Sequence, residues 1–336
     1  MRSTGLRLPP VRKLEYNAHG QTNVSIVPVQ RLRAIRFVFG RTSMNNNIAQ
    51  TPPSAPVHSR LRGLTEESLA EYYSGRKLWG DDFGIEEIRE WYQLEENACF
   101  DIYDQGRRRM PNNDYLHWQN GYRWALNGRN TLGKVLGLGS GNGEEFRPVR
   151  QCIGHLYIVE SAGGYFKNDA ATTYVKAQVD GSLDFADEFF DTAVNIAVLH
   201  HIPNLSHVLR ELFRVLKPGG ICLIKEPITT LGDWHPPRKP GLAPCERGFP
   251  RDLLEKMIRQ AGFELVRKSY FEFPPLRHVR DRGGIDTYNS KFWTGLDWFC
   301  CRLTDWNYRY HRQGWFQKLA PSYAFLVLKK PVVLSS

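Results

Sequence analysis

The chain has 336 residues, of which 41% are hydrophobic and 12% aromatic, so it can bury a large core in one or two domains. Its six cysteines form no CxxC pair and show no zinc-ligand spacing, which argues against a disulfide framework or a zinc module. We therefore expect free thiols and a cytoplasmic location. No transmembrane segment is expected, because no apolar run approaches the roughly 20 residues that a bilayer requires.

The net charge of +10 suggests a nucleic-acid partner, but its distribution argues against one. Residues 1–62 contain ten Lys or Arg and one acid, Glu15, whereas the rest of the chain has 35 basic and 34 acidic residues. A nearly neutral folded part lacks the broad basic face that phosphate binding needs, so we expect no nucleic acid. Residues 1–62 are predicted to be a mostly disordered basic extension. It would be a transit-like presequence, a basic tail, or sequence upstream of a start at Met44.

Residues 63–130 are predicted to form an N-terminal helical cap. A helix follows the capping residue Thr65 and runs from Glu66 to Tyr73. Ile85 to Tyr103 has apolar residues at helical spacing, and a third helix is predicted from Tyr115 to Leu126. All three segments are rich in Trp and Tyr, which suits an aromatic cap over a substrate and also suits plain packing.

Short apolar runs alternate with helices from Lys134 onward. The runs predicted as strands are 135–138, 156–159, 174–179, 192–196, 221–224, 263–266 and 323–328. Leu205 to Leu216 has amphipathic helical spacing, and another helix follows Pro250. This alternation predicts an α/β fold with a doubly wound, mostly parallel seven-stranded sheet. The domain would span 131–336, with insertions at 227–250 and 274–321.

The most informative stretch runs from Gly137 to Glu145, directly after the first strand. Gly139, Gly141 and Gly143 read GxGxG, and glycine lets the backbone turn tightly and lets a ligand approach where a Cβ would clash. The dinucleotide fingerprint GxGxxG does not fit, because Glu144 occupies the place of its third glycine. No Gly-Lys-Ser/Thr follows, so the loop is not a Walker loop either. The acidic pair after the loop would repel a pyrophosphate but tolerate a cation.

Further motifs follow this loop in order. They are Glu160 after the second strand, Phe190-Asp191 before the fourth, Leu199-His200-His201 after it, and Leu216-Lys217-Pro218-Gly219-Gly220 before the fifth. Together with Val135-Leu136-Gly137-Leu138-Gly139-Ser140-Gly141-Asn142-Gly143, this order resembles the class I S-adenosylmethionine (SAM)-dependent methyltransferases of the type 11 group. The resemblance covers residues 134–273 and a last strand at 322–330. It implies a Rossmann-like methyltransferase fold and SAM as cofactor.

The resemblance also implies which residues would hold SAM. The methionine part would be cradled by Gly139, Ser140, Gly141 and Gly143, and Glu160 would accept hydrogen bonds from the ribose hydroxyls. The adenine site would be lined by Asp180, Gly181, Ser182 and Leu183, and the residues near the sulfonium would be Asn195, Ile196 and Ala197. The family usually has an acid where this chain has Gly137. Since that acid helps to orient the SAM amino group, its absence weakens binding or shifts the role to Glu144.

Methyl transfer is an in-line displacement, so the enzyme mainly aligns the acceptor and excludes water. His200 and His201 follow the fourth strand and Glu226 ends the fifth, at the sheet edge where ligands bind, so we take these three as catalytic candidates. The competing interpretation is that the histidines only cap or pack. Some relatives hold a metal with acids in this segment, where this chain has Ala197 and His200, so no metal is expected.

The two insertions are candidates for the acceptor side. The segment 231–250 would place a loop over the ligand edge, and its polar residues His235, Arg238, Glu246 and Arg247 are predicted to contact a polar substrate. The aromatic residues of 292–316 suit a surface that contacts a membrane. The favoured function is a small-molecule O-methyltransferase acting on a sugar or glycolipid. The alternatives are an RNA or protein methyltransferase and a non-catalytic scaffold.

Overall fold

The computed structural model describes residues 65–104, 113–161, 168–234, 242–243 and 245–332, without the side chains of 96–104. All of these residues belong to one compact unit, Pro53–Ser336. The basic extension predicted at residues 1–62 lies outside the described residues. Among the described helices, none is both long enough and apolar enough to cross a bilayer.

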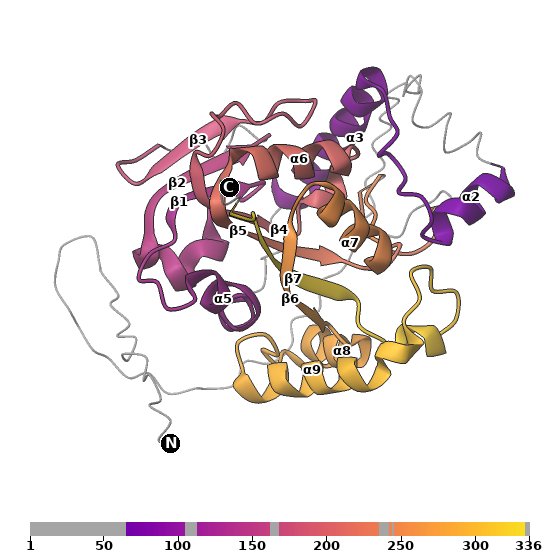
Figure 1. Ribbon diagram of the computed structural model, residues 1–336. Helices are drawn as coiled ribbons and strands as arrows, with labels where there is room; N and C mark the ends of the chain where they lie inside the picture. The colour runs from indigo at the N-terminus through magenta and orange to yellow at the C-terminus, as the bar shows by residue number, and fades with distance from the viewer. Residues whose placement is uncertain (1–64, 105–112, 162–167, 235–241, 244, 333–336) are drawn as a thin grey trace, which may run out of the picture. The chain divides into compact units, whose positions relative to one another are not determined.

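Seven strands form one sheet in the order β3-β2-β1-β4-β5-β7-β6 (Figure 1). They are β1 (Gly133–Leu138), β2 (Ile153–Glu160), β3 (Thr172–Lys176), β4 (Phe190–Ile196), β5 (Leu216–Pro227), β6 (Glu264–Phe271) and β7 (Tyr323–Lys329). β1 to β5 pair in parallel, and β7 runs antiparallel to both β5 and β6. This confirms the predicted doubly wound, mostly parallel sheet. The carboxyl ends of β1 to β6 meet at one edge, because only β7 runs in the opposite direction.

Helices and short turns connect and cover the strands. The helices are α2 (Glu66–Tyr73), α3 (Ile85–Asp104), α4 (Asp114–His117), α5 (Arg123–Leu126), α6 (Leu205–Val215), α7 (Arg251–Gln260), α8 (Pro274–Gly283) and α9 (Lys291–Thr304). The shorter turns are η1 (Trp118–Tyr122), η2 (Glu144–Cys152), η4 (Leu199–His201), η5 (Asp305–Asn307) and η6 (Phe316–Lys318). α6 contacts both β5 and α7, and α8 and α9 lie together beside β6 (Figure 1).

Side chains alternate between the two faces along each strand, and those of the central strands are buried on both faces. On β5, Cys222 and Ile224 pack with the apolar faces of α6 and α7, whereas Leu223 packs on the opposite face. That opposite face is covered by residues 114–126, which the sequence had placed in the cap.

The third predicted helix is interrupted. Its middle turn, η1, is a π-helix, where Gly121 lies so close to β7 that an added Cβ would overlap the ring of Phe325. A π-bulge shifts the helical register by one residue. Close packing against the sheet therefore prevails over the continuous helical pattern of the sequence.

α2 and α3 join a third buried cluster that is rich in tryptophan. Trp79 and Trp91 pack with Trp234 of the 231–250 insertion and with Tyr310 near the C-terminal end. The aromatic residues of the N-terminal helices therefore pack mainly against each other and against this insertion.

Candidate active site

A sharp bend follows β1. Gly139, Gly141 and Gly143 have φ values of 60°, 50° and 75°, in the left-handed region that glycine adopts without strain. A Cβ added at Gly139 would overlap Val198, whereas a Cβ at Gly141 would meet no atom within 4 Å. The bend is therefore tightly packed at its start and open at its middle glycine, where a ligand has room.

Glu160 ends β2 beside this bend. Its carboxylate accepts the backbone N–H of Gly141 at 2.9 Å and that of Ser161 at 2.9 Å. The carboxylate that the resemblance assigns to the ribose is thus held against the glycine bend. The bend after β1 and Glu160 at the end of β2 are 19 residues apart in the sequence and meet here because the two strands pair in parallel.

The structure explains why Gly137 replaces the usual acid. A Cβ at Gly137 would lie 2.5 Å from the Ser140 hydroxyl and 2.9 Å from the ring of Phe146, so no larger residue fits beside them. Of the two acids that follow, Glu144 is 65% exposed and pairs with Arg147 at 3.0 Å. Glu145 is half-buried. Burial raises the pKa of its carboxyl group to about 7, although the neighbouring Ser140 acts to lower this pKa. Glu145 therefore interacts with a residue of the bend, whereas Glu144 pairs with Arg147.

The segment after β3 is held by its own hydrogen bonds. Asp180 accepts the N–H of Ser182 at 2.9 Å, and Gly181 has a φ of 81° and packs against Val208. Leu183 is buried, and its N–H donates to Glu211. An adenine contact at these residues stays a prediction, and the backbone amide of Leu183 is already paired.

β4 leads into a second turn with a left-handed residue. Asn195 is buried and donates through Nδ2 to the carbonyl of Leu223 at 3.3 Å, while Ile196 packs into the core face of 114–126. Ala197 has a φ of 55°, unusual for a residue with a Cβ, and its N–H donates to the carbonyl of Lys225 at 2.8 Å. This turn leads the chain across the carboxyl end of β5.

The histidine pair follows this turn and is bound to the end of β5. Glu226 is fully buried, and its Oε1 accepts the N–H groups of Val198 and Leu199 at 3.0 and 2.7 Å. Its Oε2 lies 2.6 Å from Nδ1 of His200. Both carboxylate oxygens of Glu226 are thus engaged by the histidine turn, and Glu226 positions His200.

Two further carboxylates complete the cluster. Nε2 of His200 lies 3.5 Å from Oε1 of Glu246, and Nδ1 of His201 lies 2.6 Å from Oε2 of Glu95 on α3. The two imidazole rings are 4.1 Å apart. His201 is 28% exposed and is the more accessible histidine. The sequence brought together His200, His201 and Glu226, but Glu246 was assigned to the substrate and Glu95 was missed.

The position of Glu95 on its helix could have indicated its role from the sequence. On α3 it continues the apolar spacing of Ile88 and Trp91, so an acid stands on the buried stripe of the helix. An acid on such a stripe needs a partner, because a buried carboxylate without one is strongly unfavourable.

Charges inside the cluster shift its pKa values. Burial lowers the pKa of His200, but Glu226 and Glu246 outweigh burial and raise it to about 9. Burial raises the pKa of Glu246, but the hydrogen bond and charge of His200 outweigh it and lower this pKa to about 2. At neutral pH, His200 is therefore an imidazolium between two carboxylates, which makes it a poor proton acceptor.

The remaining predicted substrate residues are differently placed. Arg247 is fully buried, and its guanidinium donates to the carbonyls of Trp79, Ile202 and Pro203 at 2.6, 3.2 and 2.8 Å, with a longer bond to His200. This geometry makes Arg247 a support for the histidine turn. His235 and Arg238 lie outside the described residues.

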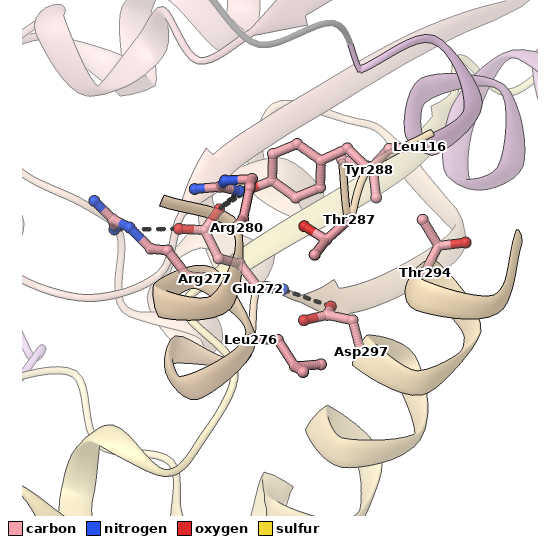
Figure 2. Close-up of a pocket in the computed structure, with 9 residues that line it drawn as sticks. All are labelled: Leu116, Glu272, Leu276, Arg277, Arg280, Thr287, Tyr288, Thr294 and Asp297. Carbon is pink, nitrogen blue, oxygen red and sulfur yellow. Dashed lines mark hydrogen bonds and ion pairs between the residues drawn. The ribbon is translucent and has the colours of Figure 1, made fainter. Parts of the chain in front are cut away.

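A second polar cluster lies on the other side of β5. Lys225 is buried 3.3 Å from His117, and burial lowers its pKa to about 8. Nearby is a small pocket in which Glu272 faces two arginines and a tyrosine, and Asp297 accepts the N–H of Glu272 (Figure 2). Its lining residues are Leu116, Glu272, Leu276, Arg277, Arg280, Thr287, Tyr288, Thr294 and Asp297.

Comparisons with known proteins show a similarity to methyltransferases. Residues 136–224 match the model of a family described as "Methyltransferase domain". The chain is 29% identical over 161 residues to 24-methylenesterol C-methyltransferase 2 of Oryza sativa subsp. japonica, which covers 42% of this chain and 44% of that protein. It is 30% identical over 139 residues to a putative methyltransferase of Encephalitozoon cuniculi, which covers 39% and 62%. The chain thus spans less than half of the sterol methyltransferase.

Among solved structures, a putative sarcosine dimethylglycine methyltransferase from Galdieria sulphuraria has a TM-score of 0.46 and 13% identity to this chain. The match covers 70% of this chain and 98% of that protein.

Proposed function

Because the chain belongs to the class I SAM-dependent methyltransferases, we propose that it transfers a methyl group from SAM to a small molecule. The observation that carries this proposal is the open glycine bend at Gly141 with Glu160 held beside it. SAM would supply the electrophilic methyl group on a sulfonium. An acidic surround of Glu145 and Glu160 suits this cation better than it suits a pyrophosphate.

Each SAM contact assigned by the resemblance remains part of this proposal. Gly139, Ser140, Gly141 and Gly143 would surround the methionine part, since only a bare backbone leaves room there. Glu160 would exchange its hydrogen bond with Gly141 for the ribose hydroxyls. The adenine and sulfonium sides would be formed by Asp180, Gly181, Ser182 and Leu183 and by Asn195, Ile196 and Ala197. The cytoplasmic location also stays a prediction from the cysteine pattern.

On the acceptor side, we propose that His201 faces the substrate. It lies at the carboxyl edge of the sheet, it is partly exposed, and Glu95 fixes the orientation of its ring. His200 and Glu226 act as positioning residues, because both are buried and paired. Of the two predicted substrate residues that the structure describes, Glu246 is the one whose side chain faces a histidine ring.

For the acceptor, we favour an apolar molecule that resides in or on a membrane. The relatives that match include sterol C-methyltransferases. The chain also has an exposed aromatic surface, here called the α9 surface, and Trp306 and Trp315 on it are 72% and 74% exposed. The α9 surface consists of Phe292, Trp298, Phe299, Leu303, Trp306, Trp315 and Phe316. A sugar hydroxyl carried on a lipid, the acceptor inferred from the sequence, is the second candidate.

SAM binding measured by calorimetry tests the cofactor site. A valine at Gly141 would fill the open space at the bend, so we expect Gly141→Val to abolish SAM binding. Gly128→Val is the matched control, because Gly128 also has a positive φ and open space but lies before β1, outside the bend. Unchanged affinity of Gly141→Val would refute the loop assignment. A wild-type protein that binds no SAM would favour the scaffold alternative.

Radiolabelled methyl transfer tests the acceptor. The purified protein is incubated with labelled SAM and, separately, with sterols, quinones, lipid-linked sugars, RNA or peptides. We expect label in the apolar lipid fraction. We also expect that changing Trp306 and Trp315 to Gln lowers sedimentation with phosphatidylserine-containing vesicles. Label in RNA or peptide alone would refute the small-molecule proposal, and label only in sugars would replace the favoured acceptor with the second.

A further inference from the structure

We propose that His200, His201 and Glu246 form a binding site for one divalent transition-metal ion of the Zn²⁺ type. Within the part of the chain that the structure describes, one nitrogen of each imidazole and one oxygen of Glu246 lie within 4.8 Å of one another. Two histidines and one carboxylate are a ligand set that binds Zn²⁺ and other borderline divalent metals. This proposal reverses the expectation from the sequence that the chain holds no metal.

The strongest support comes from the groups behind the histidines. Nδ1 of His200 is held by Glu226 and Nδ1 of His201 by Glu95, each at 2.6 Å, so Nε2 is the nitrogen of each ring that would bind an ion. In His200 this nitrogen faces Oε1 of Glu246. Metal-binding histidines usually carry such a carboxylate on the far nitrogen, which fixes the tautomer and the ring orientation. Both carboxylates are anchored in turn, because Glu226 accepts two N–H groups of the turn and Glu95 accepts the N–H of Cys245 at 3.0 Å.

The two oxygens of Glu246 have different contacts. Its Oε2 accepts the N–H of Ala243 at 2.9 Å, and its Oε1 lies 3.5 Å from Nε2 of His200. Ligand atoms about 2.0–2.1 Å from a tetrahedral Zn²⁺ are about 3.3 Å apart, so this pair already has the required spacing. The separations within the group exceed that spacing by at most about 1.5 Å, which small side-chain rotations can close.

The buried charges favour a dication at this place. Glu95, Glu226 and Glu246 contribute three negative charges, and the nearby Arg247 contributes one positive charge. A dication would balance the two negative charges that remain. Unbalanced buried charge is unfavourable, so a bound dication would neutralise the cluster.

Three protein ligands leave a fourth position for water or a substrate oxygen, as catalytic zinc sites do. The partial exposure of His201 places this position at the accessible side of the cluster. The part of the inference in which an acceptor oxygen takes that position rests on the proposed function. With the ion bound, His201 would act as a metal ligand and not as a free base.

Metal binding is tested without SAM or acceptor, so that its result is independent of the methyltransferase proposal. The full chain is treated with a chelator and dialysed, and then titrated with Zn²⁺ by calorimetry and with Co²⁺ by visible absorption. We expect one ion per chain, and Co²⁺ bands of the intensity typical of four- or five-coordinate sites. His201→Gln and Glu246→Gln should lose this binding. Glu95→Gln should weaken it by about 10- to 100-fold, because it removes only the group behind a ligand.

His278→Gln is the control, since His278 is an exposed histidine on α8 away from the cluster, and it should bind as the wild type does. Circular dichroism and thermal unfolding show whether each variant is folded, and Glu95→Gln keeps the test valid if His201→Gln unfolds. A wild-type chain without stoichiometric Zn²⁺ binding would overturn the proposal. Full binding by folded His201→Gln and Glu246→Gln would also overturn it, because the ion would then lie elsewhere.

Discussion

Replacing Arg247 by methionine separates a supporting role from a substrate-binding one. Methionine keeps much of the apolar volume but leaves the buried carbonyls of Trp79, Ile202 and Pro203 without their donor. Each unsatisfied buried carbonyl costs about 1–3 kcal/mol, and removal of a buried cation returns part of this sum. We expect a net loss of about 3–5 kcal/mol in the free energy of unfolding. For a domain of this size that corresponds to a fall of roughly 10 °C in Tm.

Thermal unfolding and urea denaturation of Arg247→Met measure this effect directly. Arg247→Lys should fall between the variant and the wild type, because one ammonium group cannot reach carbonyls that a planar guanidinium reaches together. Arg302→Met, on the exposed side of α9, is the control and should change Tm little. If Arg247→Met instead keeps its Tm and only raises KM for the acceptor, then Arg247 contacts substrate, and the supporting role derived from its four hydrogen bonds is wrong.

Three more predictions follow from particular contacts. Gly121→Ala should lower the free energy of unfolding by about 1–3 kcal/mol, because the added Cβ would overlap the ring of Phe325. Gly295→Ala should leave this free energy unchanged, because Gly295 on α9 has open space beside it. Urea denaturation of both variants tests the difference. Burial lowers the pKa of Lys225 to about 8, so below pH 8 the charged ammonium group destabilises the folded state to its full extent. The wild type should therefore gain stability relative to Lys225→Met between about pH 8 and 10.5. Parallel plots of the free energy of unfolding against pH for the two proteins would contradict this. SAM affinity should fall in Glu145→Gln and stay unchanged in Glu144→Gln, and calorimetry that shows the reverse would return the role to the exposed acid.

The sheet was predictable because parallel strands buried on both faces appear as short apolar runs, and each predicted run became a strand. The limits of the strands were less predictable. β5 begins at Leu216 instead of 221, because Gly219 and Gly220 exchange backbone hydrogen bonds with Lys330 of the last strand's end. Such pairing depends on a partner more than 100 residues away, which a local pattern does not contain.

The site divides in the same way. The glycine bend and Glu160 are local motifs at strand ends, and the structure brings them together as the resemblance implies, although their contacts with SAM remain proposals. The inward position of Glu145 was not readable, because neighbouring acids on a turn look alike until packing turns one of them inward. Glu95 comes from a helix that the sequence placed in a separate cap, and only the packing of Trp91 against the histidine turn brings it to His201.

The histidine turn is held more firmly than packing alone requires. The carbonyl of His201 accepts a bond from the Trp91 indole, and those of Ile202 and Pro203 accept bonds from Arg247. The N–H groups at the start of the turn are bound by Glu226. Two buried carboxylates, a third that is partly buried, and a buried guanidinium are costly to desolvate, and apolar residues of similar volume would often give equal or greater stability. A cluster of this kind is therefore better explained by what it orients, namely two adjacent imidazole rings, than by the stability that it contributes.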